Sequence, residues 1–198
     1  MANANFDKAI RKTFQGSRVT YGFLRGSDTI VLIKNGAGGT CRAGKHKHLK
    51  MALRLRELHG YSVICASNPL DNEETYRLDK KVLADFAAEQ GFASYRVYLV
   101  GTSDGGDQIL KLAMELHQTE KLLAINPSVV ALTDMAANLR RLPQVEKQIF
   151  YGTLDDEVAL APLLKAENIP NLQIDLIPGA DHRFTGMVDT YITLADRL

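Results

Sequence analysis

Short apolar runs alternate with segments of helical periodicity along this chain, and this alternation limits the possible folds more than any other feature of the sequence. The runs are rich in Val, Ile, Leu and Tyr with little polar alternation, which is typical of strands covered on both faces. We expect strands at residues 18–24, 29–35, 61–67, 96–101, 121–126, 147–152 and 172–177. We expect helices at residues 45–59, 74–90, 104–118, 131–141, 158–167 and 186–197.

Strands that alternate with helices predict an α/β fold, here a three-layer sandwich with a mostly parallel sheet of about seven strands and helices on both faces. The first strand should run antiparallel to the rest, because residues 25–28 are too few for a crossover helix. Gly60 and Gly91 are expected to end helices. The chain of 198 residues shows no repeat or linker, so we expect a single domain over residues 1–198.

The fourth apolar run leads directly into Gly101-Thr-Ser-Asp-Gly105, and a helical pattern begins at once. A serine between a strand and a helix in this pattern indicates a sharp, strained turn known as a nucleophile elbow. The residues two positions before and after Ser103 must be small, which Gly101 and Gly105 satisfy. The turn exposes the Ser103 hydroxyl and directs the free N–H groups of a helix N-terminus toward developing negative charge.

Two further strand ends carry residues with matching chemistry. The sixth run ends in Gly152-Thr-Leu-Asp155, and the seventh is followed by Gly179-Ala-Asp-His182. Ligands bind beyond the carboxyl ends of strands in open α/β sheets, so these residues should lie near Ser103. A serine hydroxyl becomes a nucleophile when an imidazole removes its proton, and a carboxylate orients that imidazole. Asp156 is the alternative carboxylate, although the spacing from Gly152 favours Asp155.

The motifs at residues 35–39, 101–106, 152–155 and 179–184 resemble those of small α/β-hydrolases that lack a lid, and the resemblance covers about residues 18–198. It implies that Ser103 is the nucleophile, Asp155 the orienting acid and His182 the general base and acid. The order Ser, Asp, His along the chain is the one that this family shows.

The resemblance also implies an oxyanion hole made by the backbone N–H groups of Ala37 and Asp104, with Gly38 as a substitute for Ala37. Each such donor contributes about 3 kcal/mol to the transition state. Many relatives have histidine where this chain has Asn35. Because this residue is not a catalytic group, the difference bears on the geometry of the loop and leaves the expected reaction unchanged. Larger relatives insert a lid near residues 127–144, where this chain has room for only one helix, so we expect no cap domain and an open, shallow cleft.

These features predict a serine hydrolase that cleaves a small-molecule carboxylic ester or thioester through an acyl-enzyme. A peptidase or amidase would use the same residues, and a non-catalytic interaction module on the same fold is the alternative from another class. The predicted reaction requires no metal and no organic cofactor. The chain carries no signal that defines its substrate or its oligomeric state.

Composition sets the expected partners and compartment. The chain has 24 Lys and Arg against 23 Asp and Glu, a net charge of +1, which favours neither nucleic acid nor a membrane as a partner. No signal sequence is evident, and no apolar run approaches the roughly 18 residues of a membrane span. Cys41 and Cys65 lack metal-ligand spacing. We therefore expect a reduced, soluble, cytoplasmic protein.

Two charged features bear on substrate choice. A basic run just past the Asn35 loop forms either a solvated helix face or a site that attracts carboxylate or phosphate. Its members are Arg42, Lys45, His46, Lys47, His48, Lys50, Arg54 and Arg56. Asp104 suits a helix N-terminus. Because some relatives with the same Ser-Asp-Gly-Gly elbow act on esters that bear an amino group, its carboxylate also suggests a preference for cationic acyl groups.

Overall fold

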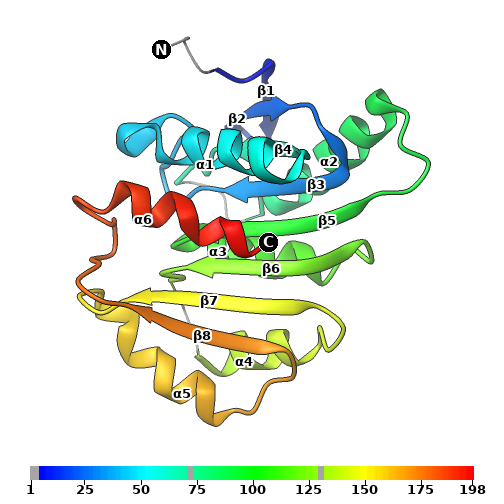
Figure 1. Ribbon diagram of the computed structural model, residues 1–198. Helices are drawn as coiled ribbons and strands as arrows, with labels where there is room; N and C mark the ends of the chain where they lie inside the picture. The colour runs from blue at the N-terminus through cyan, green and yellow to red at the C-terminus, as the bar shows by residue number, and fades with distance from the viewer. Residues whose placement is uncertain (1–4, 71–73, 129–131) are drawn as a thin grey trace.

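The computed structural model of the chain describes residues 5–70, 74–128 and 132–198, and its centre is an eight-stranded sheet (Figure 1). The strand order is β1-β2-β4-β3-β5-β6-β7-β8. The strands are β1 (Lys8–Phe14), β2 (Ser17–Leu24), β3 (Ser27–Lys34), β4 (Tyr61–Ala66), β5 (Arg96–Thr102), β6 (Thr119–Ile125), β7 (Glu146–Gly152) and β8 (Leu172–Ile177).

The sheet is parallel from β4 to β8, whereas β2 runs antiparallel to β4, as the short connection after β2 predicts. The parallel register brings the strand ends to one edge. Lys34 lies opposite Gly101, Thr102 opposite Ile125, and Gly152 opposite Ile177. Residues that follow these strands therefore meet at the carboxyl edge of the sheet.

The expectation of about seven strands is one too few, because β1 forms an eighth strand antiparallel to β2. The sequence of β1, Lys-Ala-Ile-Arg-Lys-Thr-Phe, is short of apolar residues, and its burial alternates between exposed and half-buried. A search for buried apolar runs misses such a strand, since only one of its faces packs on the protein. Lysine and arginine on an edge strand also discourage pairing with another chain.

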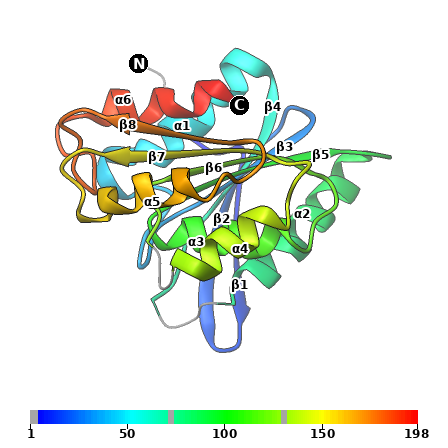
Figure 2. The same ribbon diagram turned by 90° about the horizontal axis from the view of Figure 1, so that it is seen from below.

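Helices cover both faces of the sheet, which confirms the expected three-layer sandwich (Figure 2). One face carries α1 (Ala43–His59), α6 (Val188–Thr193) and the 3-10 turn η2 (Leu194–Arg197). The other carries α2 (Tyr76–Gln90), α3 (Asp104–Ala113), α4 (Leu132–Arg140) and α5 (Leu160–Ala166), the last preceded by η1 (Asp156–Ala159).

The expected helix at 104–118 ends at Ala113, while those at 158–167 and 186–197 each divide into an α-helix and a 3-10 turn. Gly60 and Gly91 end α1 and α2 with positive φ angles of 69° and 73°, as predicted. The described part of the connection between β6 and β7 contains α4 and no inserted domain. Across the three described ranges, no helix combines the length and apolar character needed to cross a membrane.

A charged pair lies in the core beneath α2. Lys34 Nζ lies 2.8 Å from Asp79 Oδ2, and both side chains are fully buried. The Tyr21 hydroxyl donates a hydrogen bond to Asp79 Oδ1 at 2.7 Å, and Lys34 donates to Thr75 Oγ1 at 3.0 Å. A buried charge is tolerated only when it is paired and hydrogen-bonded, so each member of the pair depends on the other.

Replacing Asp79 with asparagine should lower the free energy of unfolding by about 3–5 kcal/mol, because Lys34 would keep a buried charge without a counter-ion. The measurement is urea denaturation at neutral pH. Lys80→Ala is the matched control, since Lys80 on the same helix pairs with Glu115 at the surface and should cost less than about 1 kcal/mol. Similar losses of unfolding free energy in both variants would contradict the view that the buried Lys34 depends on Asp79 as its counter-ion.

Candidate active site

Ser103 occupies the turn between β5 and α3 with a backbone conformation that is rare for a residue other than glycine. Its φ is 53° and its ψ is −128°. A Cβ atom added at Gly101 would lie 2.4 Å from the carbonyl oxygen of Gly105, and one at Gly105 would lie 2.5 Å from that of Lys34. Both positions therefore exclude any side chain. The close packing of three backbone segments holds Ser103 in its strained conformation.

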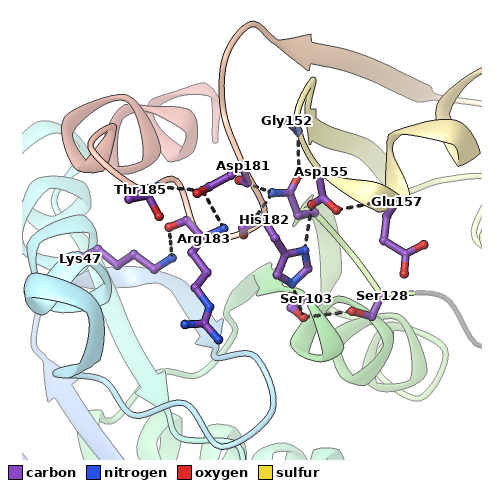
Figure 3. Close-up of polar contacts among 11 residues, drawn as sticks. Lys47, Ser103, Ser128, Gly152, Asp155, Glu157, Asp181, His182, Arg183 and Thr185 are labelled. Carbon is purple, nitrogen blue, oxygen red and sulfur yellow. Dashed lines mark hydrogen bonds and ion pairs between the residues drawn. The ribbon is translucent and has the colours of Figure 1, made fainter.

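His182 bridges Ser103 and Asp155 (Figure 3). Its Nε2 lies 2.9 Å from Ser103 Oγ, and its Nδ1 lies 2.8 Å from Asp155 Oδ2. The Asp155 side chain is 1% exposed and that of His182 41% exposed. The buried Asp155 carboxylate thus contacts one ring nitrogen of His182, and the Ser103 hydroxyl contacts the other. The structure brings together the three side chains that the sequence singled out.

Asp155 and Asp156 occupy different environments. Asp155 follows β7, and its Oδ1 accepts a hydrogen bond from the backbone N–H of Glu157 at 2.9 Å. Asp156 is exposed and begins η1. Because Asp155 alone of the two contacts the imidazole, the geometry favours it as the carboxylate partner of His182.

Asn126, which sequence reasoning did not identify, ties together the segments that carry Asp155 and His182. It is fully buried at the end of β6. Its Oδ1 accepts from the backbone N–H of Gly152 at 2.7 Å, while its amide donates to the carbonyls of Asp181 and His182 at 3.1 and 3.2 Å. A polar residue directly after an apolar strand was the available signal.

Ser128 is a second residue that the sequence reading missed. Its hydroxyl lies 3.0 Å from Ser103 Oγ, and it follows the same strand as Asn126. In Figure 3, Ser128 and His182 approach Ser103 from different elements. The Ser103 oxygen is therefore held by two polar neighbours.

The loop after β3 packs directly against Ser103. A Cβ atom at Gly36 would lie 3.1 Å from that of Ser103. Asn35 is fully buried, and its amide donates to the carbonyl of Ala66 at 2.6 Å, so it joins the ends of β3 and β4. Ala37 follows Gly36 in this loop. On the opposite segment, Asp104 supplies the first N–H of α3, a position without an intrahelical acceptor.

The Asp104 carboxylate points to a neighbouring amide: its Oδ2 accepts from Asn68 Nδ2 at 2.6 Å. The suggested recognition of cationic acyl groups by Asp104 stays a prediction. Among the residues that the structure describes, no group of three or more His, Cys, Asp or Glu side chains is placed to hold a metal ion. Cys41 and Cys65 are buried free thiols.

A groove with a cavity volume of about 670 Å³ adjoins Ser103 and His182. Three segments line most of it: the β3 loop at residues 36–39, the start of α1 at residues 44, 45, 47 and 48, and the His182 loop at residues 182–186. The start of α1 is unusual, because Gly44, Lys45 and His46 have positive φ angles and form a left-handed turn. This turn brings α1 to the rim of the groove.

Three buried side chains, Thr102, Tyr191 and His48, are linked by hydrogen bonds next to the turn that holds Ser103. The Tyr191 hydroxyl contacts both Thr102 Oγ1 and, at 2.8 Å, His48 Nε2. Burial of the His48 ring, with a smaller contribution from the positive charge of Lys47, lowers the pKa of His48 to about 3. His48 is therefore neutral in the folded protein and belongs to the packing behind Ser103.

Solved structures with low sequence identity share this fold. An α/β serine hydrolase homologue from Coxiella burnetii aligns with a TM-score of 0.74 at 18% identity, covering 97% of each chain. Est1E from Butyrivibrio proteoclasticus aligns with a TM-score of 0.73 at 13% identity over 96% of each chain. A dienelactone hydrolase from Anabaena variabilis gives 0.68 at 17% identity, covering 96% of this chain and 94% of its own. No protein-family model matches the sequence, and no curated protein matches it significantly.

Acid should destabilise the protein in part through His48. Its pKa is about 6.5 in an unfolded chain and about 3 when folded, so below pH 6.5 the unfolded state binds a proton that the folded state does not. Between neutral pH and about pH 5 this difference removes about 2 kcal/mol of stability. The loss is measured by urea denaturation at both pH values.

His48→Gln removes this titration while keeping an acceptor for Tyr191, so its stability should fall by about 2 kcal/mol less than that of the unmodified protein over the same interval. His117→Gln is the control, because His117 is exposed, and it should show the full loss. An equal loss in the His48→Gln variant and the unmodified protein would rule out His48 as a source of acid sensitivity.

Proposed function

We propose that this chain, which has the fold of the α/β-hydrolase superfamily, is a serine hydrolase that cleaves a carboxylic ester or thioester. The observation that carries the proposal is the continuous contact from Ser103 Oγ through both ring nitrogens of His182 to the buried Asp155. Names of two structurally similar proteins, a serine hydrolase homologue and a dienelactone hydrolase, agree with it.

In the first half-reaction, His182 Nε2 takes the proton of the Ser103 hydroxyl as Oγ attacks the carbonyl carbon. The Asp155 carboxylate accepts a hydrogen bond from Nδ1–H and stabilises the imidazolium. The N–H groups of Ala37 and Asp104 stabilise the oxyanion of the tetrahedral intermediate. His182 then gives its proton to the departing alcohol or thiol, and the acyl group remains on Ser103.

In the second half-reaction water takes the place of the Ser103 hydroxyl as nucleophile, and Ser103 becomes the leaving group. His182 Nε2 takes a proton from water, whose oxygen attacks the acyl carbon and forms a second oxyanion. Collapse of this intermediate breaks the bond to Ser103, which regains its proton from His182. The products are a carboxylic acid and the alcohol or thiol released earlier. Asn126 hydrogen-bonds both segments that carry Asp155 and His182.

A fluorophosphonate probe should label the protein covalently at Ser103, because it reacts with a serine activated by an adjacent base. Ser103→Ala should abolish labelling and lower ester hydrolysis by at least about a thousandfold. Intact-protein mass spectrometry and hydrolysis of p-nitrophenyl and thioester substrates provide the measurements. Lack of labelling in the folded, unmodified protein would favour a non-catalytic interaction module instead.

The two neighbouring aspartates give a sharper test of the orienting group. Asp155→Asn should lower kcat by about a thousandfold or more, since an amide leaves the imidazole in an unsuitable tautomer and stabilises the imidazolium poorly. Asp156→Asn is the matched control and should retain most of the activity, because Asp156 is exposed. A greater loss from Asp156→Asn would transfer the role to that residue.

A further inference from the structure

The basic run of the sequence divides into residues with different roles. Arg54 and Arg56 form ion pairs with carboxylates of other segments, and His48 is buried in the packing behind the elbow. Lys45 and Lys47 line the groove beside Ser103, as does His48, but His48 is neutral and the two lysines carry charge. These two lysines are the charged part of the run that a bound substrate would meet.

Arg183 adds a third cation from a distant segment, since it directly follows His182 and also lines the groove. Figure 3 shows Lys47 and Arg183 together on the side of His182 opposite Ser128. The described lining of the groove contains these three cationic side chains and neither aspartate nor glutamate. Every formally charged side chain of the described lining is therefore a cation, although the whole chain has a net charge of only +1.

Lys47 is half-buried within this cluster. Its Nζ lies 4.1 Å from the centre of the Tyr191 ring and donates to the carbonyl of Arg183 at 3.3 Å. Burial lowers the pKa of Lys47 to about 8; Asp181 opposes this shift, and the charge of Arg183 adds to it. Desolvating an ammonium group costs free energy that a nearby anion would recover.

The described carboxylates leave the cluster without an ion pair. None lies within ion-pair distance of Lys45, Lys47 or Arg183. Asp181 is the nearby acid, but its Oδ1 accepts the backbone N–H groups of Arg183 and Thr185 at 3.0 and 2.8 Å. With respect to the described carboxylates, the cations thus remain available to an anionic ligand beside Ser103.

We propose that Lys45, Lys47 and Arg183 form a subsite for a carboxylate or phosphate group carried by the ester or thioester that Ser103 attacks. The inference rests on the proposed function, and it specifies the substrates of that hydrolase as esters or thioesters with an anionic group. It favours anionic over cationic substrates, because Asp104 is outside the groove lining and its carboxylate is bound by Asn68.

Paired substrates test this subsite. The p-nitrophenyl half-ester of adipic acid carries a carboxylate on its acyl side, and its methyl-capped form is the neutral partner. The anion p-acetoxybenzoate and its methyl ester form the pair with the charge on the leaving group. The unmodified protein should show a kcat/KM at least about tenfold higher for the anionic member of one pair, which also identifies the side of the substrate that the cations bind.

The double variant Lys47→Gln/Arg183→Gln should lose this preference, and Lys47→Arg should keep most of it. The control Lys50→Gln/Lys81→Gln removes the same charge from exposed positions outside the groove and should keep the preference of the unmodified protein. Absence of an anionic preference in both pairs, or its persistence in the Lys47→Gln/Arg183→Gln variant, would overturn the inference.

Binding to the inactive Ser103→Ala protein separates the inference from the proposed function. Calorimetric titration should show the adipate half-ester or p-acetoxybenzoate binding at least about tenfold more tightly than its neutral partner, with the difference shrinking as salt is added. Equal binding within both pairs would refute the subsite even if the unmodified protein hydrolyses esters. Selective binding combined with no hydrolysis and no fluorophosphonate labelling would instead refute the proposed function and leave an anion site.

Discussion

The candidate site depends on a backbone approach so close that no side chain fits between the segments. Gly101 on β5 and Gly105 on α3 lie against each other, and Gly105 also meets the end of β3. This packing lets α3 begin directly at the carboxyl edge of the sheet and fixes Ser103 at a positive φ. The strain at Ser103 costs on the order of 1–3 kcal/mol, which the surrounding packing offsets. The position of the half-buried Ser103 hydroxyl at the groove is a consequence of this arrangement.

The remaining parts of the site are held by buried polar groups. Asn126 links the ends of β6 and β7 to the His182 loop, and Asn35 links the ends of β3 and β4. Backbone groups at strand ends lack a neighbouring strand to pair with, and a buried amide side chain can satisfy them: Asn126 bonds three backbone groups and Asn35 bonds one. Asn126, which completes hydrogen bonding at this edge of the sheet, therefore also joins the segments that carry Asp155 and His182.

Charge is distributed in this protein by structural role. Lys34 and Asp79 neutralise each other in the core, and Arg54 and Arg56 meet carboxylates at the surface. Lys47 differs from these four residues, since it is half-buried against the Tyr191 ring, lines the groove and has no ion pair with a described carboxylate. The sequence does not distinguish these cases. A lysine or arginine gives the same local sequence signal whether or not the fold brings a carboxylate from a distant segment next to it.

The sequence by itself determined the α/β layering, the antiparallel β2 and the glycine-flanked turn at Ser103, because periodicity and turn chemistry act between residues close in the chain. It also named Asp155 and His182, since each follows a parallel strand and such strands end at one edge. Tertiary structure alone revealed the solvent-facing strand β1, Asn126 beneath the His182 loop and the convergence of Arg183 with Lys47. These depend on contacts between distant segments, and no local pattern records which side chains such contacts bury, pair or leave facing a groove.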